Sequence, residues 1–202
     1  MTNIPYDQRI ARILVPSLAR LGATPNQVTI LSLALCLSAS GLFAIGTEAA
    51  AHWAAGLFVL GRFLDHFDGE LARLTGTSSR FGYYLDYAAG GAGYAALFAG
   101  IGFGLAGGPL GIWAPVLGLT GAAAAIVSMG LNLDLDRQQE LAEGDSTGYP
   151  GLGGFELEDG IYLLAPITWL GWLSPFFVAA GIGAALYCLW TLGRVLRARQ
   201  AR

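Results

Sequence analysis

Three aspartates within apolar stretches are the side chains of this sequence best suited to chemistry. Asp65 and Asp68 stand three residues apart, so they project from one face of a helix, where they could share a cation. Asp86 follows in the next apolar stretch, and Arg73 between them carries a planar donor fork that suits phosphate. Because charges inside a bilayer are costly, carboxylates set into apolar helices indicate a functional site.

The composition places these aspartates in a membrane. The chain of 202 residues is 54% hydrophobic and only 12% charged, and its mean hydropathy is +0.55. These values are typical of an integral membrane protein and exclude an ordinary soluble domain of this length. The 30 glycines fit a helix bundle with close backbone contacts. A net charge of −3 argues against nucleic acid as a partner.

The apolar stretches predict an all-α fold, an integral membrane six-helix bundle with an N-terminal amphipathic interfacial helix. Residues 1–22 carry apolar side chains at helical spacing with arginines between them, as in a helix lying on a membrane surface. The polar N-terminus indicates that there is no cleavable signal peptide. One domain, 1–202, accounts for the sequence. The membrane helices are expected over 25–46, 51–74, 81–104, 110–132, 160–174 and 175–193.

The arginines predict the orientation of this bundle. All eleven basic residues are arginines, and with a cytoplasmic N-terminus they gather at the cytoplasmic ends of the expected helices. Arg62 is the exception, because it lies deeper, one turn before Asp65. This positive-inside pattern places both termini and the aspartates on the cytoplasmic side. The lack of lysine, with abundant alanine, glycine and arginine, favours a GC-rich bacterial genome and hence the bacterial cytoplasmic (inner) membrane.

The order of these residues resembles the motif of the CDP-alcohol phosphotransferase (CDP-alcohol phosphatidyltransferase) family, D-x2-D-G-x2-A-R-x8-G-x3-D-x3-D. The segment from Thr24 to Thr29 is also similar to the one that opens the first membrane helix in that family. The resemblance implies phospholipid biosynthesis, in which a phospho-alcohol or phosphatidyl group passes from a CDP-linked donor to an alcohol and CMP is released. Seven of the eight motif positions match at the right spacing: Asp65, Asp68, Gly69, Ala72, Arg73, Gly82 and Asp86.

The resemblance also implies roles for these residues. Asp65, Asp68 and Asp86 would hold Mg²⁺ or Mn²⁺, since these ions prefer oxygen ligands. Family members are typically homodimers, so a homodimer is expected, with contacts through glycine- and alanine-rich helix faces. The residues expected to line the pocket for the CDP moiety are Gly69, Ala72, Arg73 and Gly82.

The last motif position departs from the family pattern. Four residues after Asp86 the family has an aspartate that is assigned as the general base for the acceptor alcohol, whereas this chain has Gly90. Loss of a general base typically costs about 10²–10⁴-fold in rate. His66 points away from Asp65 by helical geometry, which favours a packing role. The carboxylates and the imidazole that could replace the base are Asp86, His66, Glu156, Glu158 and Asp159.

The acidic segment 134–159 bears on the acceptor. It holds eight carboxylates and a single arginine, Arg137. A phosphorylated acceptor needs a basic pocket, so this segment favours a neutral or cationic alcohol. Two other hypotheses stay open. The chain could be a non-catalytic relative that binds a CDP-lipid, which Gly90 motivates, or a small membrane transporter whose path is marked by the carboxylates.

Overall fold

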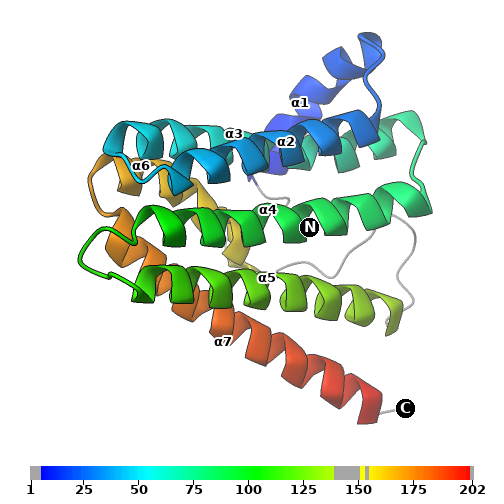
Figure 1. Cartoon of the computed structure of the whole chain (residues 1–202). Helices are drawn as coiled ribbons and strands as arrows, with labels where there is room; N and C mark the ends of the chain where they lie inside the picture. The colour runs from blue at the N-terminus through cyan, green and yellow to red at the C-terminus, as the bar shows by residue number, and fades with distance from the viewer. Residues whose placement is uncertain (1–5, 139–150, 153–154, 201–202) are drawn as a thin grey trace.

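The computed structural model describes residues 6–138, 151–152 and 155–200, and these form a bundle of helices (Figure 1). The all-α membrane fold expected from the sequence is confirmed. Between α5 and α6 lie a 3₁₀ helix and two short paired strands. The elements are α1 (Tyr6–Arg20), α2 (Pro25–Ala44), α3 (Glu48–Thr75), α4 (Arg80–Gly104), α5 (Trp113–Gln138), β1 (Gly151–Leu152), β2 (Phe155–Glu156), η1 (Leu157–Leu163), α6 (Leu164–Trp169) and α7 (Leu173–Gln200).

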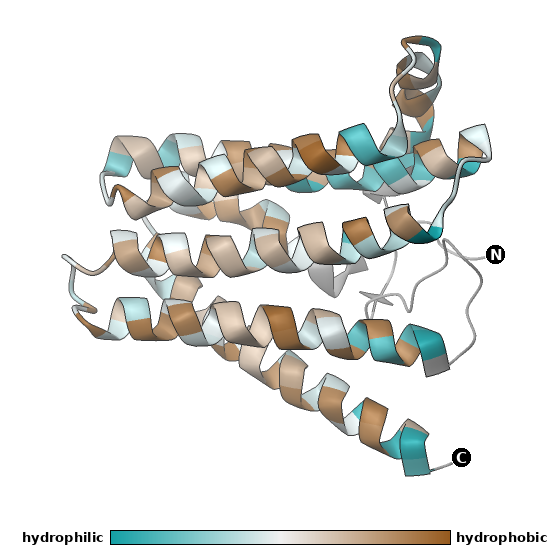
Figure 2. Ribbon diagram, turned by 45° about the vertical axis from the view of Figure 1, so that its right-hand side comes forward, coloured by the Kyte–Doolittle hydropathy of each residue, from teal (hydrophilic) through white to brown (hydrophobic). Residues whose placement is uncertain are grey.

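Among the described residues, three helices have the length and apolar composition needed to cross a bilayer: α2, α5 over Trp113–Arg137, and α7. Helices α3 and α4 lie beside them and are of similar length, 28 and 25 residues (Figure 1). Hydrophilic residues gather at the end of the bundle where α3 meets α4 and where α5 and α7 end (Figure 2). Asp65 and Asp68, in the second half of α3, and Asp86, near the start of α4, therefore lie toward the polar end of an otherwise apolar bundle.

The helix expected over 160–174 differs from the one found. Residues 157–163 are 3₁₀ helix, and only Leu164–Trp169 are α-helical. Gly171, at φ 78°, then turns the chain before α7 begins. The left-handed conformation that glycine adopts without strain ends α6 early. The last helix also differs, since it begins at Leu173 and continues through the arginine-rich tail to Gln200.

Helix boundaries near the site follow local capping chemistry. Thr24 and Gln27 form a reciprocal capping box at the start of α2, with Pro25 in the first turn. Gly76, at φ 64°, closes the C-terminus of α3, and Ser79 caps α4 three residues later. The link between α3 and α4 is consequently short, and it sends α4 back along the bundle, where α4 packs against α2 and α5.

Close backbone contact holds α4 against its neighbours. A Cβ atom on Gly100 would overlap the carbonyl oxygen of Ser40 in α2, and one on Gly104 would overlap that of Phe43. Gly102 and Gly118 make a similar approach between α4 and α5. Only glycine permits helices to come this near, as is common in membrane bundles.

Helix α1 packs on the polar end of α3. Its apolar residues Ala11 and Val15 are buried against Phe67 and Leu71. Its opposite side exposes Ile13 and the neighbouring Ile10 and Leu14. Such a helix, apolar on the outside at the polar end of a membrane bundle, fits the interfacial position expected from the sequence.

Candidate functional site

The three aspartates predicted to share a cation lie together. Asp65 and Asp68 come from α3 and Asp86 from α4, and one carboxylate oxygen of each lies within 4.8 Å of the others. Asp68 is buried, the Asp65 side chain is only 10% exposed and Asp86 is exposed, so the cluster opens toward solvent on the Asp86 side. Three negative groups so close repel one another unless a cation lies between them. This all-oxygen donor set fits a hard divalent cation.

Helix α2 supports the two aspartates of α3 with hydroxyl groups. The Thr29 hydroxyl donates a hydrogen bond to Asp68 Oδ2. Ser32 Oγ lies 3.0 Å from Asp65 Oδ1. Thr29 and Ser32 were not among the predicted site residues. The signal for them was their three-residue spacing on one face of an apolar helix, the same spacing as that of Asp65 and Asp68.

Arg62 partly balances the charge of the cluster. Its Nη1 lies 2.8 Å from Asp65 Oδ2, and both side chains are about nine-tenths buried. The guanidinium also stacks over the Tyr94 ring, 4.8 Å from its centroid. Arg62 thus offsets part of the negative charge of the cluster through Asp65.

Arg73, the residue predicted to bind phosphate, folds back along α3. A Cβ atom on Gly69 would lie 3.5 Å from Arg73 Nη2, so the guanidinium lies over the glycine. Arg73 Nη2 also lies 2.9 Å from Glu70 Oε1. Ala72 is half-buried on the same turn of α3. The structure therefore brings Gly69 and Arg73 together one residue beyond Asp68.

Gly82 brings the start of α2 close to the start of α4. A Cβ atom at this position would lie 3.1 Å from Asn26 Oδ1 and 3.2 Å from Ser79 Oγ. The N-terminal segment of α2, quoted above for its resemblance to the family, thus borders the same end of the bundle as the motif.

Gly90, which stands at the place of the missing aspartate, is buried between α4 and α5. A Cβ atom there would lie 2.9 Å from the methyl carbon Cε of Met129. The end of Met129 thus occupies the space that a larger residue at position 90 would need. Of the candidate replacement bases, His66 is half-buried on α3 beside Asp65. The side chains of Glu156, Glu158 and Asp159 lie outside the described part of the structure.

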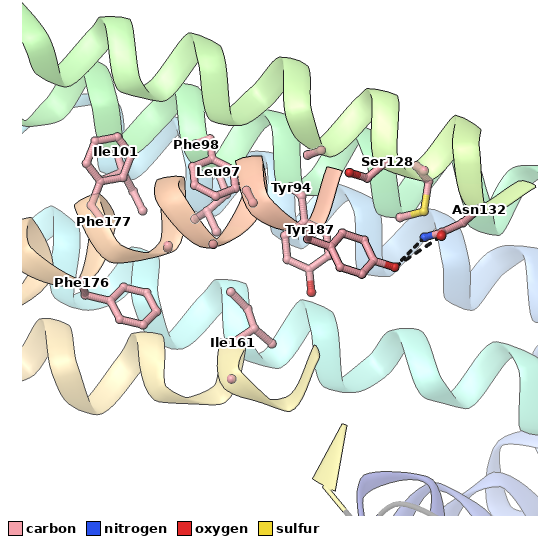
Figure 3. A pocket seen from close by; sticks show the side chains of 16 residues that line it. Tyr94, Leu97, Phe98, Ile101, Ser128, Asn132, Ile161, Phe176, Phe177 and Tyr187 are labelled. Carbon is pink, nitrogen blue, oxygen red and sulfur yellow. Dashed lines mark hydrogen bonds between the residues drawn. The ribbon is translucent and has the colours of Figure 1, made fainter. Parts of the chain in front are cut away.

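A cavity of about 330 Å³ adjoins Met129 (Figure 3). It lies between α4, α5, α7 and η1, and most of its lining is apolar. At one end, Asn132 Nδ2 donates a 3.0 Å hydrogen bond to the Tyr187 hydroxyl. The Ser128 hydroxyl on the same wall is buried and has no hydrogen-bond partner among the described residues. Sequence reasoning missed this cavity because its walls come from four distant segments.

A second buried carboxylate lies at the interface of α4 and α5. Asp136 accepts hydrogen bonds from the Tyr83 hydroxyl, at 2.8 Å, and from the Tyr87 hydroxyl. Only 3% of Asp136 is exposed. The two phenol donors come from α4 and the carboxylate from α5, so these hydrogen bonds fix α5 against α4.

Comparison with known proteins agrees with the motif. The model of the CDP-alcohol phosphatidyltransferase family matches residues 22–150. The archaetidylinositol phosphate synthase of Pyrococcus horikoshii is 44% identical over 70 residues, which are 35% of this chain and 36% of that protein. This curated relative is therefore matched over little more than a third of its length.

Solved structures show the same fold. The phosphatidylinositol phosphate synthase PgsA1 of Mycobacterium tuberculosis, in a crystal structure with CDP-DAG bound, has a TM-score of 0.69 and 22% identity over 93% of this chain and 94% of that one. Its complex with manganese and citrate gives a TM-score of 0.69 and 22% identity over 92% of this chain and 88% of that one.

Proposed function

Because the chain belongs to the CDP-alcohol phosphatidyltransferase family, we propose that it transfers a phosphatidyl or phospho-alcohol group from a CDP-linked lipid to an alcohol and releases CMP. The observation that carries this proposal is the cluster of Asp65, Asp68 and Asp86, whose oxygens lie within 4.8 Å of one another. The matched region contains the whole cluster and the residues around it.

Each part of the site has a role in this proposal. Asp65, Asp68 and Asp86 would hold Mg²⁺ or Mn²⁺, which when bound neutralises the diphosphate of the donor. Arg73 binds a phosphate through its remaining N–H groups. Gly69 and Gly82 let the nucleotide approach the backbone, and the small side chain of Ala72 leaves room for the nucleotide in the pocket. A manganese complex is among the similar solved structures, which supports a divalent ion in this chain.

The donor is proposed to be a CDP-linked lipid, since a relative of the same fold has been crystallised with CDP-DAG. The bundle supports this choice because its cluster lies at the polar end of membrane-spanning helices. A lipid donor can then place its diphosphate at the cluster while its chains stay in the apolar region.

The acceptor has two candidates. The acidic segment 134–159 favours a neutral or cationic alcohol, as argued above. The names of the relatives instead favour an inositol phosphate. Arginines of α7 support this second candidate: Arg199 Nη2 reaches α5 at Asp134, 2.6 Å away, and Arg194 stacks over Trp190. The tail thus supplies positive charge beside the acidic segment, which suits an anionic acceptor.

The general base is proposed to be Asp86, with His66, Glu158 and Asp159 as replacements. The exposure of Asp86 supports this choice, because an acceptor can reach it from solvent. Gly90 favours a second function, that of a non-catalytic relative which binds the CDP-lipid without turnover. Met129 strengthens this alternative, since its methyl group occupies the position next to Gly90.

The test is CMP release from CDP-diacylglycerol by the purified chain in lipid, with Mg²⁺ or Mn²⁺ and with inositol phosphate, an amino alcohol or no acceptor. CDP-choline serves as the alternative donor. Asp68→Asn is the matched inactive control. Acceptor-dependent CMP release supports the transferase and identifies the acceptor. If the chain binds CDP but releases no CMP in any of the conditions tested, the result supports the non-catalytic relative.

The remaining expectations are part of the same proposal. The chain is an integral membrane protein, proposed to lie in a bacterial cytoplasmic membrane with both termini and the site on the cytoplasmic side. The distribution of arginines supports this orientation. A homodimer is proposed because α5 and α7 expose large apolar side chains, such as Ile126 and Leu186, that could face a second copy as well as lipid.

A further inference from the structure

One buried carboxylate, that of Glu70, is shared by arginines from two different helices. Its Oε1 lies 2.9 Å from Arg73 Nη2 on the next turn of α3. Its Oε2 lies 3.0 Å from Arg12 Nε on α1. The Glu70 side chain is 7% exposed, whereas each arginine side chain is 47% exposed. Glu70 occupies one of the variable positions of the motif, so the motif assigns it no role.

The contact with Arg73 orients that side chain toward the site. Glu70 holds Nη2, and a guanidinium has five N–H donors in a fixed fork. The same Nη2 lies over Gly69, at 3.5 Å from where a Cβ atom would be. A long side chain that would otherwise sample many rotamers is thus held over Gly69, the residue after Asp68, with further donors left for a ligand.

The contact with Arg12 ties the same carboxylate to the docking of α1. Ala11 and Val15, on either side of Arg12, pack against Phe67 and Leu71, which flank Glu70 on α3. If α1 leaves α3, Glu70 loses one of its two cations and gains access to water. The preferred position of its carboxylate, and therefore of Arg73, then changes.

We infer that Glu70 is a positioning residue that couples the docking of α1 on α3 to the binding of a diphosphate by Arg73. The identity of the ligand rests on the proposed function. Coupling between two sites is reciprocal, so a ligand that binds better when α1 is docked must itself favour the docked state by the same factor. The interfacial helix thereby makes the nucleotide site responsive to its contact with the membrane.

The experiment uses the full chain in lipid nanodiscs, with CDP and Mg²⁺ as the probe. CDP affinity is measured by calorimetry, and protection of α1 by amide hydrogen exchange with and without CDP. Glu70→Gln keeps the shape of the side chain but removes its charge. Arg12→Ala removes only the ion pair between Glu70 and α1. Arg20→Ala, an exposed arginine at the end of α1, is the matched control.

We expect Glu70→Gln to weaken CDP binding by about 10-fold and Arg12→Ala by about 5-fold, at the lower end of typical coupling. Both variants should lose the extra protection of α1 that CDP induces in the unmodified chain, whereas Arg20→Ala should keep it. In turnover, both should raise the KM for the donor with little change in kcat.

Unchanged CDP affinity in Glu70→Gln, or α1 protection by CDP that persists in Arg12→Ala, overturns the inference. If Glu70→Gln fails to fold, Arg12→Ala alone decides, because its side chain is half-exposed and its loss leaves Glu70 paired with Arg73. Absence of CDP binding in the unmodified chain also overturns it. If CDP binds and protects α1 but no CMP is released, this inference stands and the proposed transferase activity is rejected.

Discussion

Thr29 of α2 donates a hydrogen bond to Asp68 of α3, across 39 positions of the chain. Only 7% of Asp68 is exposed, so water cannot readily replace the hydroxyl. The site is therefore made by three helices, although the motif that indicates it lies on two of them.

Replacing Thr29 by valine should reduce function without unfolding the protein. The valine keeps the shape of the side chain but leaves one oxygen of Asp68 without its donor, and loss of such an outer partner typically costs about 10–100-fold in metal affinity or activity. Thr29→Ser retains the hydroxyl and is the control. Mn²⁺ affinity by electron paramagnetic resonance checks the prediction, and equal affinity in Thr29→Val and the unmodified chain would contradict it.

Removing one carboxylate of the cluster should abolish cation binding. Asp65→Asn removes the carboxylate that pairs with Arg62 and one of the three charges of the cluster. We therefore expect CMP release to fall by about 10³-fold, since a bound ion supplies several kcal/mol of charge stabilisation. Glu48→Gln, which changes an exposed acidic residue at the start of α3, is the control. Comparable loss in both variants would mean that total negative charge, and not the cluster, governs activity.

The effect of Gly90→Asp on stability should depend on which residue stands at position 129. The new Cβ atom would lie 2.9 Å from Met129 Cε, so the end of the methionine must move, and the adjoining cavity of about 330 Å³ can receive it. We expect Gly90→Asp to lower the free energy of unfolding by about 1–3 kcal/mol, as overpacking typically does. Met129→Ala in the same chain should recover most of that loss.

The control for this pair is Met129→Ala alone. Because the two positions are in contact, the double variant should lose less unfolding free energy than the two single variants lose when their losses are added together. Simple additivity in thermal unfolding would mean that Met129 is not what limits position 90. The restored aspartate also tests the base, since CMP release that appears only with Gly90→Asp would show that the site retains everything else it needs.

Gly100→Ala should separate α4 from α2. Its Cβ atom would overlap the backbone carbonyl of Ser40, which no side-chain movement can relieve. We expect a loss of about 1–3 kcal/mol or more in unfolding free energy. Gly181→Ala on α7 is the matched control, because nothing lies within 4 Å of that position and alanine is the better helix former. Unfolding in a detergent series measures both, and similar stabilities would contradict the prediction.

Local signals in the sequence were sufficient for the helices near the site. The first long helix begins at Pro25, as expected, and is capped by Thr24. The spacing of Asp65 and Asp68, with Asp86 added by the resemblance to the family motif, predicted the cluster that the structure contains. Such features depend on residues within one or two turns, or on a short link between two helices, so sequence periodicity reports them directly.

Features made by distant segments could not be predicted in the same way. The contacts of Thr29 and Ser32 depend on how α2 packs on α3, and the position of Met129 next to Gly90 depends on the approach of α4 to α5. The fifth apolar stretch was predicted as one long helix because composition does not distinguish α from 3₁₀ geometry. The structure divides it at Leu163 and ends it before Gly171.

The short link between α3 and α4 has a consequence for how the protein folds while it is being synthesised. Every matched motif position lies between Asp65 and Asp86, and the supporting hydroxyls of α2 precede them in the chain. Local contacts form faster than distant ones because they close smaller loops. As the nascent polypeptide enters the bilayer, the acidic cluster can therefore assemble while α5, α6 and α7 are still being synthesised.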